Sequence, residues 1–171
     1  LADRIRGCFY LGASRTPAQD LEFLIDELVE IALRALSPGM NDPFTAVTCF
    51  HWMGAALAKL ADRSLTQGPD QHGYDRRRVR PKADDFAHFL SRSFGGVRMA
   101  AATEPIAAQM YLESLANIAR GATSPDRRHL LREEGRLLAE QAATALCGPA
   151  LAQVEARFRL FHQEMAAIEP R

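Results

Sequence analysis

The sequence has no excess of charge of either sign and few cysteines. Lys plus Arg and Asp plus Glu number 21 each, so the formal net charge is zero. Dedicated nucleic-acid binders usually carry a basic excess, so we expect no nucleic-acid partner. The three cysteines, Cys8, Cys49 and Cys147, form no C-x-x-C pair. This spacing predicts neither a zinc knuckle nor a disulfide framework, and it indicates reduced thiols in a cytoplasmic setting.

Sequence signatures of catalysis are also missing. The chain has neither a G-x-S-x-G nucleophile elbow nor a glycine-rich phosphate loop of the Walker or Rossmann kind. The histidines are scattered without metal-ligand spacing, at His51, His72, His88, His129 and His162. We therefore predict no catalytic residue, no metal and no cofactor, and an enzyme is disfavoured.

No segment has the composition of a membrane span. From Phe44 to Ala61 the only full charge is Lys59, but alanines and polar residues make this segment less apolar than a lipid-facing helix. We predict a buried central helix here instead. The chain begins at Leu1 with charged residues close behind, so we expect no signal peptide, and we expect a part of a longer protein.

Prolines mark the expected helix starts, because the first helical turn tolerates a missing N–H and a preceding Asp, Ser or Thr can cap the helix. No stretch shows sustained period-two alternation. The sequence predicts one all-α domain, a bundle of about six helices. An extended arm (1–16) precedes the first helical pair (17–63), a basic connector (64–82) follows, and the remaining helices occupy 83–171. The expected helices are 17–36, 43–63, 84–101, 105–119, 125–146 and 149–168.

The apolar pattern differs between these helices. The first has one apolar arc opposite an acidic one, and Phe23 and Leu33 intrude on the polar side, which indicates a second contact there. The second is apolar almost all round, and we predict that His51 is a core histidine with a local partner. The last carries a heptad seam that packs either within the bundle or across a dimer. Its members are Leu151, Val154, Phe158, Phe161, Met165 and Ile168.

Two runs of sequence resemble a known family. Residues 15–20 read R-T-P-A-Q-D, and residues 32–46 read A-L-R-A-L-S-P-G-M-N-D-P-F-T-A. They match the motifs RT-x-x-QD and A-x-RALSPG-x-NDP-x-TA, so the chain resembles the C-terminal soluble region of the Domain of Unknown Function 2254 family of predicted bacterial membrane proteins. The resemblance is specific over about residues 12–50. It implies transmembrane helices N-terminal to this region, a cell-membrane location for the whole protein, and no particular activity.

The junction of the first two helices is the candidate ligand site. Its polar side chains could converge on an anion or a carboxylate-bearing ligand, with a guanidinium fork and a helix N-terminus supplying positive charge. The candidates are Arg15, Asp20, Arg34, Asn41, Asp42 and Thr45. Helix caps and turns use the same residue types, and this structural role is favoured over a ligand site.

Two charged runs have open alternatives. The ladder Glu22, Asp26 and Glu30 could bind a divalent cation or a basic partner, but a solvated face is favoured. The connector carries a basic run that could contact anionic lipid headgroups or simply face water, with even weight on each. Its members are Arg76, Arg77, Arg78, Arg80 and Lys82.

The favoured function is therefore non-enzymatic. We expect the cytoplasmic domain of a predicted membrane protein, joined to the membrane through an N-terminal region. The heptad seam and the intruding Phe23 and Leu33 indicate that it assembles protomers into a homo-oligomer or senses a ligand. The alternative is a small-molecule or anion site at the first helix junction, which could be enzymatic.

Overall fold

The computed structural model describes residue 4, residues 20–63 and residues 86–168. Several predicted features lie outside these ranges: the arm at 1–16, the candidate ligand Arg15, and the basic run from Arg76 to Lys82. The described residues are helical, and no strand occurs among them.

Three short helical elements form one continuous stretch after the undescribed residues 64–85. α4 (Phe86–Leu90), a π-helical turn η1 (Ser91–Gly95) and α5 (Gly96–Ala102) are consecutive, and we call them the α4–α5 rod. Counting this rod once, the described part contains six helical rods, so the prediction of an all-α bundle is confirmed. The others are α2 (Leu21–Ala35), α3 (Pro43–Ala61), α6 (Pro105–Gly121), α7 (Pro125–Ala145) and α8 (Gly148–Ile168).

Most helix starts follow the expected chemistry. Pro43, Pro105 and Pro125 lie in the first turns of α3, α6 and α7. The predicted start of the first helix at residue 17 is wrong. Asp20 has an extended backbone (φ −137°) and its carboxylate accepts the N–H of Phe23, so α2 begins at Leu21.

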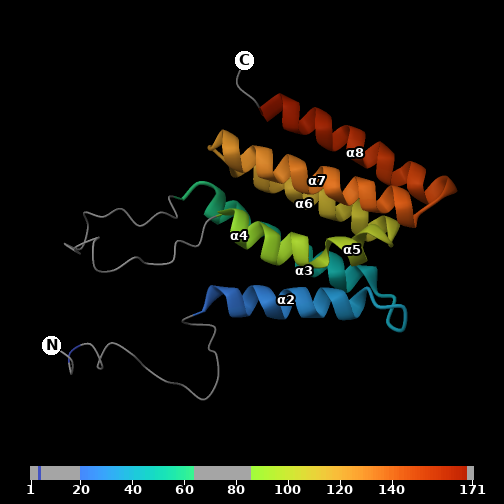
Figure 1. Cartoon of the computed structure of the whole chain (residues 1–171), viewed down its shortest axis with the longest axis horizontal. Coiled ribbons are helices and arrows are strands. Elements are labelled where there is room, and N and C mark those ends of the chain that lie inside the picture. Colours follow the sequence, from blue (N-terminus) through green and yellow to red (C-terminus); the bar gives the residue numbers. More distant parts are fainter. Residues whose placement is uncertain (1–3, 5–19, 64–85, 169–171) are drawn as a thin grey trace.

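α6 is the central helix of the bundle. Figure 1 shows α2 along one edge and α8 along the opposite edge, and α6 packs against α3, α5, α7 and α8. The larger side chains of α6 at its core, Tyr111, Leu112, Leu115 and Ile118, have no exposed surface. Several alanines between them bring the neighbouring backbones close.

The prediction that the second helix is the buried centre is wrong. α3 packs between α2 and α6, but its outer side is uncovered by the described residues. Phe44 is 70% exposed and Trp52 is 66% exposed. His51 is also exposed, so it is not a core histidine. Because the outer side of α3 carries few charged residues, the helix looks central in the sequence even though the described residues leave that side uncovered.

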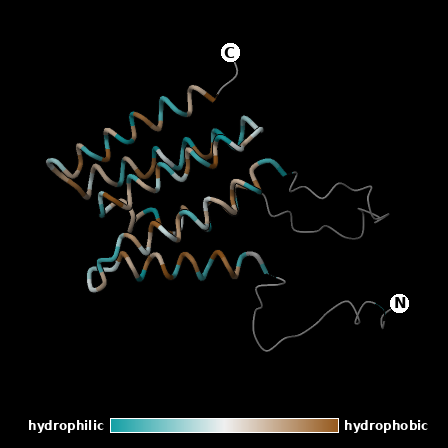
Figure 2. Tube along the Cα trace, turned by 180° about the vertical axis from the view of Figure 1, so that it is seen from behind, coloured by the Kyte–Doolittle hydropathy of each residue, from teal (hydrophilic) through white to brown (hydrophobic). Residues whose placement is uncertain are grey.

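The apolar arc of α2 is only partly covered. Ile25 and Ala32 are buried against the bundle, whereas Leu24 and Ile31 are 42% and 43% exposed. Figure 2 shows apolar positions recurring along this edge helix. Leu33, which was expected to mark a second contact, is exposed as well.

The heptad seam of α8 packs within the bundle. Val154, Phe161 and Met165 are buried, and α8 contacts both α6 and α7. The ring of Phe161 lies directly on Gly135 of α7, where a Cβ would meet its Cε1 atom at 2.5 Å. α7 and α8 therefore approach at a point that only glycine permits.

We predict that Gly135→Ala destabilises the fold by about 1–3 kcal/mol, because the fully buried ring of Phe161 cannot move aside. Gly54→Ala is the control, since a Cβ there meets only ordinary contacts at 3.6 Å and beyond. Alanine favours helix over glycine, so the control should be neutral or more stable by up to about 1 kcal/mol. Urea unfolding measures both, and equal effects would contradict the close approach.

Candidate functional site

The junction of α2 and α3 is built around the cap of α3. The two carboxylate oxygens of Asp42 accept the N–H of Thr45 at 3.1 Å and its hydroxyl at 2.6 Å. These hydrogen bonds, first that from the hydroxyl, lower the pKa of Asp42. Asn41 has a φ of 47°, a left-handed conformation that asparagine tolerates better than most residues. The turn thus accounts for the polar side chains of Asn41, Asp42 and Thr45.

The other candidate ligands lie apart from this cap or are otherwise paired. Arg34 forms an exposed ion pair with Glu30 one turn earlier in α2. Asp20 caps the opposite end of α2, about 22 Å away along a 15-residue helix. The structure therefore brings Arg34, Asn41, Asp42 and Thr45 to one end of the hairpin but not Asp20. Anion binding at this junction stays a prediction.

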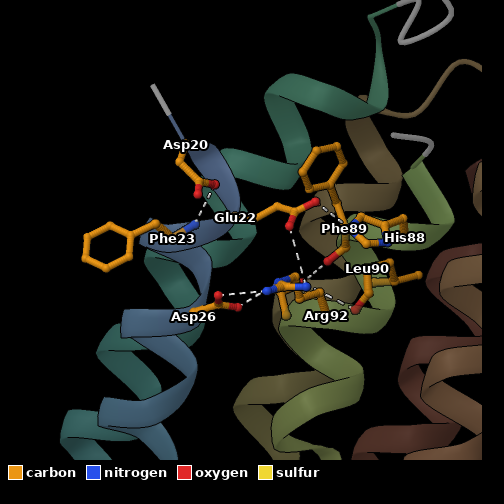
Figure 3. A network of polar contacts seen from close by, with 9 residues as sticks. Asp20, Glu22, Phe23, Asp26, His88, Phe89, Leu90 and Arg92 are labelled. Carbon is orange, nitrogen blue, oxygen red and sulfur yellow. Dashed lines mark hydrogen bonds and ion pairs between the residues drawn. The ribbon is translucent and has the colours of Figure 1, made fainter. Parts of the chain in front are cut away.

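A second polar cluster joins α2 to the α4–α5 rod, and we call it the clamp (Figure 3). Asp26 accepts two hydrogen bonds from Arg92, at 2.6 and 2.8 Å. Glu22 accepts from His88 Nε2 at 2.9 Å and lies 3.6 Å from Arg92. The acidic ladder is thus not a solvated face, because two of its three carboxylates pair with basic side chains some 66 residues away in sequence.

The π-helical turn positions Arg92 for this contact. Arg92 lies within η1, and the hydroxyl of Ser93 beside it is buried and donates to the carbonyl of Phe89 at 2.6 Å. The turn ends at Gly95, and Gly96 follows it as the first residue of α5. A Cβ on Gly96 would lie 3.3 Å from Val29, so glycine here allows α2 to approach the rod.

A third polar cluster is buried between α5, α6 and α7, and we call it the triad. Both carboxylate oxygens of Glu134 accept from Arg98 Nη1, at 2.7 and 2.8 Å. The hydroxyl of Tyr111 donates to the same carboxylate at 2.5 Å. The ring of Tyr111 packs edge-on against Phe50 and Phe94. Three helices are therefore tied together at one charged point inside an otherwise apolar core.

Sequence reasoning missed the triad, although one pattern could have indicated it. Glu134 lies three residues after Leu131 and four before Leu138, on the apolar side of α7. An acid at that position requires a basic or donor partner from a neighbouring helix. Its partners Arg98 and Tyr111 are distant in sequence, so their identity could not be read from the chain.

Burial shifts the pKa values of two titratable side chains of the core, Tyr111 and Cys49. Desolvation, followed by the charge and the hydrogen bond of Glu134, raises the pKa of Tyr111 well above its usual value. Desolvation also raises the pKa of the Cys49 thiol, which lies on the buried side of α3. Among the described residues, no three His, Cys, Asp or Glu side chains are grouped as metal ligands.

Comparison with known proteins gives family resemblance but no fold neighbour. A family model described as predicted membrane protein (DUF2254) matches residues 1–117. Uncharacterized proteins of Mycobacterium tuberculosis and Mycobacterium bovis are 33% identical over 140 residues, which cover 78% of this chain and 26% of theirs. The chain thus spans about a quarter of the length of these relatives. No solved structure matches it. Within the described ranges, no helix combines the length and apolarity needed to cross a bilayer.

We predict that the clamp pair is energetically coupled. In a double-mutant cycle with Asp26→Asn and Arg92→Gln, the bidentate, partly buried contact should give a coupling of about 0.5–1 kcal/mol, decreasing with salt. The exposed Glu30–Arg34 pair is the control and should give roughly 0.3 kcal/mol. Urea unfolding of each variant measures both cycles. A coupling free energy for the clamp no larger than that of the control pair would contradict the prediction, because the contact would then add no stability beyond that of an exposed ion pair.

We predict that Tyr111 makes stability sensitive to alkaline pH. Because its pKa is raised in the folded state, its contribution is complete below about pH 10 and is lost as the pH rises further. Tyr111→Phe should cost about 1–2 kcal/mol at neutral pH. Above about pH 10 the difference from the wild type should shrink by up to roughly 1.4 kcal/mol per pH unit. Urea unfolding across this range tests it, and a constant difference contradicts it.

Proposed function

This chain belongs to the DUF2254 family of predicted membrane proteins, and from that membership we propose that it is an assembly domain that joins protomers of such a protein. The full-length relatives are several times longer than this chain. In this proposal the domain therefore performs only part of the function of such a protein. In this proposal the domain contributes self-association and no chemistry of its own.

The observation that carries the proposal is apolar surface on the α2–α3 hairpin. Phe44 and Trp52 of α3 are each about two-thirds exposed, and Leu24 and Ile31 of α2 are more than two-fifths exposed. Single exposed apolar residues are common, but several large ones on two adjacent helices mark an interaction surface. Tryptophan is among the residues that contribute most to protein–protein binding.

The polar clusters support assembly over ligand binding because the fold already uses their functional groups. The triad satisfies Glu134 with donors from two other helices. The clamp pairs Glu22 and Asp26 with basic side chains of the α4–α5 rod. Both clusters hold elements of the bundle in place, so the large exposed side chains of the hairpin are the better-supported contact surface.

We place the domain on the cytoplasmic side in this proposal. Cys49 and Cys147 are unpaired thiols, and Cys147 is exposed, which fits a reducing compartment. The basic run from Arg76 to Lys82 fits the bias of cytoplasmic segments toward Lys and Arg.

We predict that the 171-residue chain self-associates in solution. Light scattering coupled to size-exclusion chromatography should give a mass that rises with concentration above the monomer value of 18.9 kDa. Loading concentrations should bracket about 1 μM, at which an association of roughly −8 kcal/mol is half complete. Native mass spectrometry gives the number of subunits independently. A monomer throughout the range would overturn the proposal.

A further inference from the structure

We infer that the assembly partner is a second copy of this chain, bound through the outer side of the α2–α3 hairpin about a two-fold axis parallel to the two helices. This inference rests on the proposed function and specifies its geometry. α2 is an edge helix that packs chiefly on α3 and on the α4–α5 rod. Leu24 and Ile31 are seven residues apart and so lie on one side of α2. That side is turned away from Asp26 and Val29, which contact the rod.

Residues on the two antiparallel helices of the hairpin can be compared by their distance along the helix axis from the turn, which we call their level. The N–H of Asp42 donates to the carbonyl of Ala35 at 2.9 Å, so these residues mark the turn end. Trp52 lies ten residues beyond Asp42 and Leu24 eleven residues before Ala35, so both are roughly 15 Å from that end. An aromatic side chain of α3 and an aliphatic one of α2 therefore share this level.

The same count places two further pairs at matching levels. Phe44 and Ile31 lie two and four residues from the turn end, so an aromatic and an aliphatic side chain again coincide. Between the two apolar levels, His51 lies nine residues beyond Asp42 and Glu27 eight residues before Ala35. Both are exposed, and within the described residues Glu27 has no ion-pair partner.

The distribution of charge on the two helices favours one direction of the two-fold axis over the other. Glu22 and Asp26 pair with the rod and Glu30 pairs with Arg34, which leaves Glu27 as the exposed carboxylate of α2 without an ion pair among the described residues. α3 has no carboxylate. An axis perpendicular to the helices would lay α2 on α2 and place the Glu27 carboxylates of both copies on the same pair of helices, which like charges oppose. An axis parallel to the helices lays α2 of one copy on α3 of the other and keeps every residue at its own level.

In this arrangement the three levels are complementary. Trp52 packs on Leu24 of the partner subunit, and Phe44 packs on Ile31 of the partner subunit. Glu27 faces His51 of the partner subunit between the two apolar contacts. Each contact occurs twice, because a two-fold interface presents the same surface from both copies. The two aromatic contacts flank the polar pair, and that pair fixes the register.

Trp52→Ser is the first test, with Leu160→Ser as its control. Leu160 is an exposed apolar residue of α8, at the opposite edge of the bundle (Figure 1). The Trp52 variant should raise the dissociation constant for self-association at least about 30-fold, and the control should leave it unchanged. Trp52 is mostly exposed, so at concentrations where both proteins are monomeric the variant should keep the urea midpoint of the wild type.

Charge exchange tests the register. His51→Glu should weaken association several-fold, because it sets a carboxylate against Glu27 of the partner subunit. Glu27→Lys in the same chain should restore it. A double variant weaker than His51→Glu alone would overturn the pairing.

The outcomes separate this inference from the proposed function. If the wild type associates and Trp52→Ser associates equally well, the hairpin interface is overturned while assembly stands. If the wild type is monomeric, both are overturned. Flotation with vesicles of phosphatidylglycerol and phosphatidylcholine tests whether lipid binds this surface instead. If the wild type is monomeric and binds the vesicles, and Trp52→Ser abolishes that binding, the surface is assigned to lipid.

Discussion

Close packing around α6 is the constraint on which the rest of this bundle depends. Four helical elements reach α6 because its core side alternates alanines with a few large residues. Tyr111 is the exception, since it brings a hydroxyl into that packing and needs an acceptor there. Glu134 supplies the acceptor from α7, and Arg98 from α5 neutralises the acid. Steric fit at α6 thus determines where the buried contact between Tyr111, Glu134 and Arg98 forms.

Local chemistry in the sequence predicted most of the fold, and non-local contacts account for what it missed. Proline after a capping residue located α3, α6 and α7 to within a few residues, because both effects act within one turn. The start of α2 was misplaced because Asp20, with an extended backbone, caps the helix at Leu21. The central helix was misidentified because hydrophobicity reports what a helix could bury, and α3 keeps Phe44 and Trp52 uncovered in this chain.

The polar sites show the same division. The roles of Asp42 and Glu30 followed from spacing, since their partners are three and four residues away. The clamp and the triad join residues separated by 23 to 66 positions, and a single sequence contains no record of such pairings. The family match ends at residue 117, inside α6, yet α7 and α8 complete the same hydrophobic core. The fold is therefore larger than the segment that the family model covers.

The π-helical turn makes the α4–α5 rod intolerant of changes in length. A π turn accommodates one residue more than an α-helical turn, so it rotates the following residues by about 100° relative to the preceding ones. His88 and Arg92 consequently face α2 while Arg98 faces α7. Deleting one residue from Ser91–Gly95 would leave a regular α-helix. Such a helix could satisfy the clamp or the triad but not both, so insertions and deletions should be rarer here than in an ordinary helix of equal burial.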